Sequence, residues 1–205
     1  MQRVWACVLG AIVGLSSSLA RAEDPAPATM PQLKVGDYLE VADRFLTISC
    51  KRWVVTAIDK DGFNILQCGD KLAYFSAANN GNAVKVVSTA GDTLVEFTPY
   101  APSLSFPITL GKKWEGKYKG YTADDGVRWS ATSSCEVKAF EKVTVPAGTL
   151  PAYRIDCEDA YQANGFNGYA DSKSWYSPAV GTVVKVVNDA NSKWDMQAVG
   201  VAIAK

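Results

Sequence analysis

Short alternations of apolar and polar residues, separated by turn residues, fill most of this chain. Leu46–Ile58 and Val127–Phe140 are rich in β-branched and aromatic residues, and stretches of both alternate as half-buried strands do. Turns are indicated by DKDG (Asp59–Gly62), ADDG (Ala123–Gly126) and PAG (Pro146–Gly148). No segment after residue 22 shows a 3.6-residue apolar period with helix caps. The pattern therefore predicts an all-β protein.

One pattern occurs twice, 100 residues apart: GNAVKVV (Gly81–Val87) and GTVVKVV (Gly181–Val187). Alternation within the first run places Val84 and Val86 on one side of a strand and Lys85 on the other. Upstream of each run lies a stretch that begins with Ser-Cys and ends with Cys-x-Asp, and each run follows an aromatic-Ser motif, YFS or WYS.

We interpret the shared order of these motifs as a tandem duplication, with a first β unit at residues 36–98 and a second at residues 99–205. Unrelated amphipathic strands that share common β residues are the alternative. The units are expected to pack together as one or two small domains, and whether they form one core is left open.

The first 22 residues have the anatomy of a secretory signal peptide. Arg3 precedes an apolar run from Val4 to Leu15, and Ala20-Arg21-Ala22 is a small-x-small cleavage motif. The polar, proline-bearing residues 23–35 are predicted to be a disordered linker. No later apolar run is long enough for a membrane span, so none is expected in the mature chain. These features predict a periplasmic or extracellular protein.

Four cysteines follow the predicted cleavage site: Cys50, Cys68, Cys135 and Cys157. An even number in an exported protein indicates disulfides, and the close C-x-x-C spacing of zinc sites is missing. Each sequential pair flanks one turn, so its two cysteines are expected on the two strands of one hairpin. This predicts the disulfides Cys50–Cys68 and Cys135–Cys157. The cysteines are offset from simple opposition, and a β-bulge could absorb the difference.

Composition excludes several classes of chemistry. The chain has no histidine, which removes Ser-His and Cys-His nucleophiles and the commonest zinc ligand. Loss of Arg3 and Arg21 with the signal peptide changes the net charge from 0 to −2, and a chain without a basic excess is not expected to bind nucleic acid. Nucleotide-binding and hydrolase motifs are missing. We predict no cofactor, no metal site and no enzymatic activity.

The second unit carries an insertion that the first lacks, AYQANGFNGYADS (Ala160–Ser172), with Tyr161, Phe166 and Tyr169 between turn residues. A loop here could stand off the sheet and bind a ligand through its aromatic side chains. The alternative is an extended hairpin whose aromatics fold back on the sheet.

Trp114 is a further binding candidate, because four lysines surround it in GKKWEGKYKGY (Gly111–Tyr121). Such a stretch could meet an acidic partner, although lysines of this kind are more often a solvated face. Trp53, Trp129 and Trp175 lie in strand-like runs and are expected to fill the core.

Part of the chain resembles a known group of proteins. FPITLGKKWEG (Phe106–Gly116), FEKVTVPAGTLPAYRI (Phe140–Ile155) and SWYSPAVGTVVKVV (Ser174–Val187) resemble a family of uncharacterised exported bacterial β-proteins. The family pattern is G-K-x-W, V-P-A-G-T and W-Y-S-P-x-V-G, matched over residues 106–187. The resemblance implies curved antiparallel sheets, as in half-barrels. It implies no activity and no catalytic residues.

The sequence thus predicts an all-β fold of curved antiparallel sheets, half-barrel or sandwich-like, with two disulfides. The expected role is a non-enzymatic binding or structural module, with a small hydrophobic ligand, a glycan or an envelope protein as candidate partners. A carrier of a lipid or another hydrophobic ligand is the first alternative. A glycan hydrolase with two carboxylates is the second, for which Glu115, Glu141, Glu158 and Asp159 are the residues to test.

Overall fold

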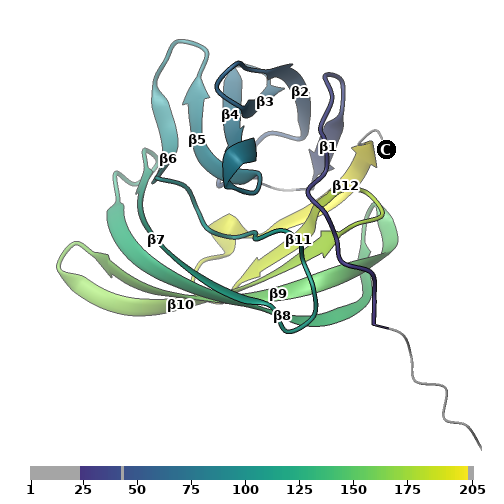
Figure 1. Ribbon diagram of the computed structural model, residues 1–205. Coiled ribbons are helices and arrows are strands. Elements are labelled where there is room, and N and C mark those ends of the chain that lie inside the picture. Colours follow the sequence, from purple (N-terminus) through teal and green to yellow (C-terminus); the bar gives the residue numbers. More distant parts are fainter. Residues whose placement is uncertain (1–23, 43, 203–205) are drawn as a thin grey trace, which may run out of the picture.

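The computed structural model describes residues 24–42 and 44–202, and strands dominate it (Figure 1). The predicted signal peptide lies outside the described residues. The first six strands are short: β1 (Tyr38–Val41), β2 (Arg52–Ile58), β3 (Phe63–Cys68), β4 (Lys71–Ser76), β5 (Asn82–Ser88) and β6 (Thr93–Thr98). The others are β7 (Lys113–Thr122), β8 (Arg128–Val145), β9 (Gly148–Ala163), β10 (Phe166–Ser177), β11 (Thr182–Asn188) and β12 (Met196–Ala202). Two 3-10 helices, η1 (Ala77–Asn79) and η2 (Ser192–Trp194), follow β4 and β11.

The twelve strands of the described chain form one closed barrel. Each strand pairs antiparallel with the next, and β1 pairs with both β2 and β12, which closes the ring. Closure leaves no unpaired edge. The predicted all-β class with curved antiparallel sheets is confirmed, and the curvature runs through to a complete barrel.

Long strands supply the curvature of one wall. β8 has 18 residues and β9 has 16, and together with β7 and β10 they form the curved lower wall in Figure 1. The register shifts within β8, where Lys138 between Val137 and Ala139 is the extra residue. It shifts again between β10 and β11, where the extra residue is Val184 on β11. An extra residue in one strand bends it and increases its twist, so the bulge in β8 helps this long strand to wrap around the interior.

Both predicted disulfides are confirmed. Cys135 on β8 lies directly opposite Cys157 on β9 and is bonded to it. Cys50, two residues before β2, is bonded to Cys68 at the end of β3. Register shifts are present in both strand pairs, between Val55 and Ala57 in β2 and at the β8 bulge.

The largest core cluster contains residues from both halves of the chain. Trp53 and Val86 from the first predicted unit pack in the same cluster as Val143, Val184 and Met196 from the second. Trp53 is fully buried, as expected of a core tryptophan. The two predicted units therefore contribute to one core within a single barrel.

The two similar seven-residue runs occupy similar local settings. Each run opens with a glycine at φ 66°, and the N–H of Gly81 or Gly181 donates to the carbonyl of the preceding Ser76 or Ser177, at 2.8 Å in both cases. Lys85 lies over the ring of Tyr74 on β4, and Lys185 over the ring of Trp175 on β10. The duplication itself stays a prediction.

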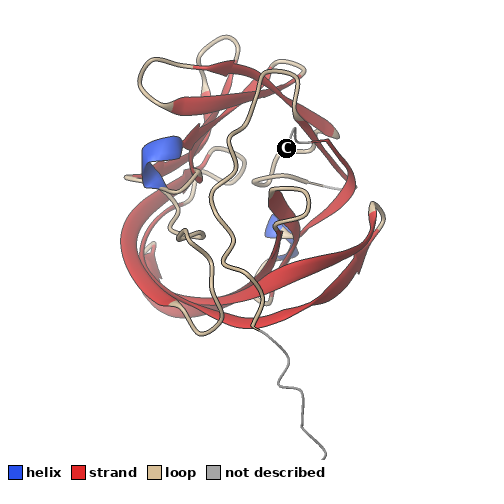
Figure 2. Cartoon of the chain, turned by 45° about the vertical axis from the view of Figure 1, so that its right-hand side comes forward, coloured by secondary structure: helices blue, strands red, loops and turns tan. Residues whose placement is uncertain are grey.

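The segment before β1 lies against the barrel. Ala28 exchanges two backbone hydrogen bonds with Ile108, and the hydroxyl of buried Tyr153 donates to the carbonyl of Ala26 at 2.7 Å. This differs from the disordered linker expected at residues 23–35, because residue 28 inserts its apolar side chain into a second core cluster with Ile108, Tyr153 and Tyr176. In Figure 2, loop segments cross the opening that the strands surround.

Asn82 anchors the long connection between β6 and β7. Its side chain is 1% exposed, donates to the carbonyls of Asn79 and Leu104, and accepts from the N–H of Leu104 and the hydroxyl of Ser103. All of these groups are buried or partly buried, where an unmade hydrogen bond is costly. These bonds hold the β6–β7 connection in place at Ser103 and Leu104.

Candidate functional site

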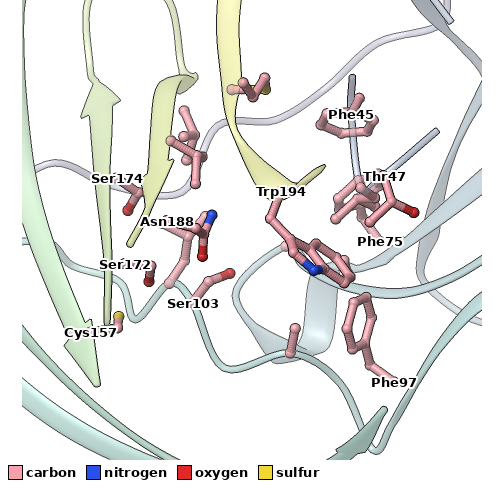
Figure 3. A pocket seen from close by; sticks show the side chains of 18 of the residues that line it. Phe45, Thr47, Phe75, Phe97, Ser103, Cys157, Ser172, Ser174, Asn188 and Trp194 are labelled. Atoms are coloured by element: carbon pink, nitrogen blue, oxygen red, sulfur yellow. The ribbon is translucent and has the colours of Figure 1, made fainter. Parts of the chain in front are cut away.

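The barrel encloses a cavity of about 580 Å³, which we treat as the candidate site (Figure 3). Most of the twelve strands contribute inward-facing side chains to its wall, as do residues 30–33, the connection between β6 and β7, and η2. A volume of this size is typical of pockets that bind one small molecule. Among the described residues, no helix is long and apolar enough to cross a membrane.

Aromatic rings form one side of the cavity. Phe97 on β6 lies 6.3 Å from the ring of Trp129 on β8 and 6.1 Å from that of Trp194 in η2. Further along the same side, Phe45 and Phe75 are 5.8 Å apart. Figure 3 shows Phe45, Phe75, Phe97 and Trp194 on the same side of the pocket. This wall offers a large apolar surface to a ligand.

Polar side chains form the opposite side. Ser172 and Ser174 on β10 and Asn188 on β11 line the cavity, and Figure 3 shows them across the pocket from the aromatic rings. Within the described chain, none of these three side chains makes a hydrogen bond to another residue. Polar groups that face a cavity without a partner in the protein can bind the polar groups of a ligand.

Asn64 on β3 adds a polar group among apolar neighbours. The residue is 9% exposed, lines the cavity and lies opposite Phe75 in the sheet register, with Leu66 two positions along. Its side chain also makes no hydrogen bond to any residue that the structure describes. An accessible amide on the cavity wall that has no partner in the protein can bind a polar group of a ligand.

Tyr118 and Asp159 form a polar pair inside the barrel. The Tyr118 hydroxyl donates to Oδ2 of Asp159 at 2.6 Å, and both residues line the cavity. Burial, and next the negative charge of Asp159, raise the pKa of Tyr118 well above its ordinary value. The phenol therefore stays protonated and acts as a hydrogen-bond donor to the carboxylate.

The β7–β8 turn and the segment before β12 meet at the rim of the cavity. Nζ of Lys193 lies 3.3 Å from Oδ2 of Asp124 and 3.8 Å from Oδ2 of Asp125. Thr122 and the N–H of Val127 donate to Asp125, as its predicted role in a turn requires. The adjacent Trp194 faces the cavity, so this segment covers part of the site.

The predicted aromatic insertion is an extended hairpin. β9 and β10 pair without interruption from Tyr153↔Tyr176 to Ala163↔Phe166, around a turn at Asn164 and Gly165, both with positive φ. Strand pairing satisfies the backbone of residues 160–172, so no loop stands off the sheet there. Of the two interpretations offered by the sequence, the structure has the extended hairpin.

The three aromatics of this hairpin are not brought together. Tyr161 faces inward, lines the cavity and covers Gly168, where a Cβ atom would lie 2.7 Å from its hydroxyl. Phe166 at the hairpin tip is 76% exposed. Tyr169 is 72% exposed, on the outer face, in a groove with Lys117 and Lys119. Of these candidates, Tyr161 belongs to the cavity.

Trp114 packs inside the protein, away from the lysines that follow it. Its indole N–H donates to the carbonyl of Pro102 at 2.8 Å, and its ring borders the second core cluster. Lys112 donates to the carbonyls of Ser105 and Pro107, and Lys113 pairs with Glu136. Through its hydrogen bond to Pro102, Trp114 packs against the β6–β7 connection and not against an acidic partner's surface.

The four acids named for a hydrolase do not share the cavity. Of them, only Asp159 lines it. Glu115 and Glu158 are exposed, and Glu141 accepts a hydrogen bond from Trp175, which is half-buried. Within the described residues, no three Asp, Glu or Cys side chains are grouped as metal ligands.

Sequence reasoning missed the aromatic wall. Phe45, Phe97 and Trp194 lie in separate hairpins or connections, and no motif links them. Alternation in TLVEFT (Thr93–Thr98) places Val95 and Phe97 on one face, which was the available signal. It could not show that this face lines a cavity.

Of three comparisons with known proteins, only the one with solved structures finds similar proteins. No protein-family model matches the chain, and no curated protein matches it. A Bacteroides fragilis protein described as exported, with a YmcC-like fold, is 13% identical (TM-score 0.48; 85% of this chain and 99% of that one covered). A Parabacteroides distasonis protein described as a lipoprotein is 14% identical (TM-score 0.47; 87% of this chain and 100% of that one covered). The hypothetical lipoprotein YmcC of Escherichia coli is 16% identical (TM-score 0.45; 83% of this chain and 84% of that one covered). Likeness at this level supports no statement about ligand or activity.

Proposed function

We propose that this protein is an exported, non-enzymatic binding protein that carries one small amphipathic molecule inside its barrel. The cavity of about 580 Å³ is the observation that carries the proposal. A role that is purely structural would not need a barrel with an unfilled interior, since close packing is the more stable arrangement.

The division of the cavity wall defines the kind of ligand. Phe45 and Phe75 offer an apolar surface to the body of the ligand, whereas Ser172, Ser174 and Asn188 offer hydrogen bonds on the other side. A ligand with an apolar body and one polar end matches both sides. The protein would then be a carrier, as in the first alternative that the sequence offered, and its hydrophobic ligand would also have a polar group.

Export to the periplasm or the cell exterior is supported by two features. The N-terminal residues 1–22 have the pattern of a signal peptide. Cys50–Cys68 and Cys135–Cys157 are disulfides, which form and persist in oxidising compartments. A non-enzymatic role is supported by the chain's lack of histidine and by the separation of the four candidate acids.

The test is native mass spectrometry of the full chain, purified from the periplasm of an expressing cell. We expect a bound small molecule in about one-to-one ratio, released on unfolding. Ser172→Phe fills the cavity from β10 and should abolish this complex. Lys173→Phe, the neighbouring residue whose side chain faces outward, is the matched control and should retain it. Equal retention by both variants would contradict the proposal.

A further inference from the structure

Charged residues around the cavity are mostly acidic. Among the described residues, its wall includes Asp37, Asp124, Asp125 and Asp159 against one basic residue, Lys193. Lys193 lies at the rim, paired with Asp124 and Asp125. No lysine or arginine of the described wall is therefore free to pair with a negatively charged ligand group.

Asp159 has an oxygen left for a ligand. Tyr118 donates to Oδ2, and within the described chain no side chain or N–H donates to Oδ1 and no cation pairs with the carboxylate. Its register neighbours are small, Ser133 on β8 and Ala170 on β10. Small neighbours leave space next to the carboxylate, on the cavity side of the sheet.

A group of aromatic rings lies next to the carboxylate of Asp159, beginning with its hydrogen-bond partner Tyr118. The Tyr118 ring lies 6.1 Å from that of Phe97, which in turn contacts Trp129 and Trp194, and all four residues line the cavity. The faces of such rings attract cations, and the attraction increases where water is excluded. A carboxylate next to a group of aromatic rings is a favourable environment for an ammonium group.

We propose that the polar end of the ligand is an organic cation, an amine or a quaternary ammonium, which pairs with Asp159 while the rings of Phe97, Trp129 and Trp194 surround it. The inference rests on the proposed binding function and specifies its ligand class. An anionic group in the same place would lie beside Asp159 with no free cation to offset its loss of water. Fatty acids and phosphate esters are therefore disfavoured, and amphipathic amines are favoured.

The experiment compares three ligands that share a twelve-carbon chain, the two ionic ones below their micelle concentrations and the neutral one below its solubility limit. Isothermal titration calorimetry of the full mature chain would measure dodecyltrimethylammonium, neutral dodecanol and laurate. We expect the ammonium compound to bind at least tenfold more tightly than laurate, with dodecanol between them. Laurate binding as tightly as the ammonium compound would overturn the inference and leave the binding function standing. Failure of all three to bind would contradict the binding function, and the ligand class with it.

Substitutions then locate the preference. Asp159→Asn keeps the shape of the side chain and should reduce the preference for ammonium over laurate about tenfold. Glu158→Gln makes the same change in charge one residue away, on the exposed side of β9, and should leave the preference unchanged. Equal preference in both variants would show that Asp159 is not the partner of the cation. Should Asp159→Asn fail to fold, Phe97→Leu should weaken ammonium binding more than dodecanol binding, and equal weakening of both would count against the inference.

Discussion

The hydroxyl of Tyr118 on β7 reaches across β8 to Asp159 on β9 with a hydrogen bond of 2.6 Å, although the two residues are 41 positions apart in the chain. Ala131, buried and small, is the β8 residue opposite both Tyr118 and Tyr161, and it leaves the room for this approach. The pair fixes a carboxylate on the cavity wall.

Tyr118→Phe should alter the dependence of stability on pH. The folded state raises the pKa of Tyr118 by burial and by the charge of Asp159. Above about pH 10 the unfolded chain therefore loses the phenolic proton before the folded chain does, and stability falls. Near neutral pH the variant should be about 1–2 kcal/mol less stable for want of the hydrogen bond.

Urea unfolding between pH 7 and pH 11 would measure this effect. The difference between wild type and Tyr118→Phe should shrink as the pH rises above 10. A constant difference over the whole range would contradict the assigned coupling between Tyr118 and Asp159.

Alanine substitution of two asparagines should lower the free energy of unfolding by very different amounts. Asn82→Ala removes four hydrogen bonds and leaves buried groups of Leu104 and Asn79 without partners, so it should cost about 3 kcal/mol of unfolding free energy. Asn188→Ala removes a side chain that has no partner in the described chain, so its effect should stay within about 0.5 kcal/mol. Equal losses in denaturant unfolding would show that the anchor has been assigned wrongly.

Gly120→Ala should disrupt the interior of the barrel. A Cβ atom at this position would overlap with the indole ring of Trp129, so the indole must move from its place beside Phe97. We expect a loss of about 2–3 kcal/mol and a shift in tryptophan fluorescence. Lys119→Ala, on the exposed face of the same strand, is the control and should change stability by less than about 0.5 kcal/mol.

Tyr161 and Tyr169 separate the inner from the outer face of the β9–β10 hairpin. Tyr161→Ala uncovers Gly168 and enlarges the cavity, so it should lower the free energy of unfolding by about 2 kcal/mol and alter ligand affinity. Tyr169→Ala should change neither, because its side chain is 72% exposed. Thermal melts together with ligand titration would check both. Loss of binding in Tyr169→Ala alone would move the site to the outer groove.

Each disulfide should contribute similarly to stability. The bridges span 18 and 22 residues, and loop-closure entropy assigns about 3 kcal/mol to a loop of this size. Replacing Cys135 and Cys157 together by alanine should therefore lower the melting temperature about as much as replacing Cys50 and Cys68. Calorimetry of both double variants would measure the two losses, and a far larger one for either pair would show a further packing role.

Local patterns of the sequence predicted the disulfide pairing and the β class, but bulges limited what alternation could assign. Val84 and Val86 are expected on one side of a strand. In β5, however, Ala83 and Lys85 pair with Phe75 and Tyr74, so Val84 is the extra residue of a bulge, and the buried apolar residues are Ala83 and Val86. A bulge depends on the partner strand, which one strand's own residues do not reveal.

The sequence by itself determined that this chain forms antiparallel strands with two hairpin-linked disulfides, because side-chain alternation and turn residues act over a few neighbours. Tertiary structure alone decided that β1 closes on β12, and that Tyr118, Asp159 and the aromatic rings face one cavity. These arrangements join residues far apart in the chain through strand curvature and register. The inner face becomes a site only when the barrel closes around it.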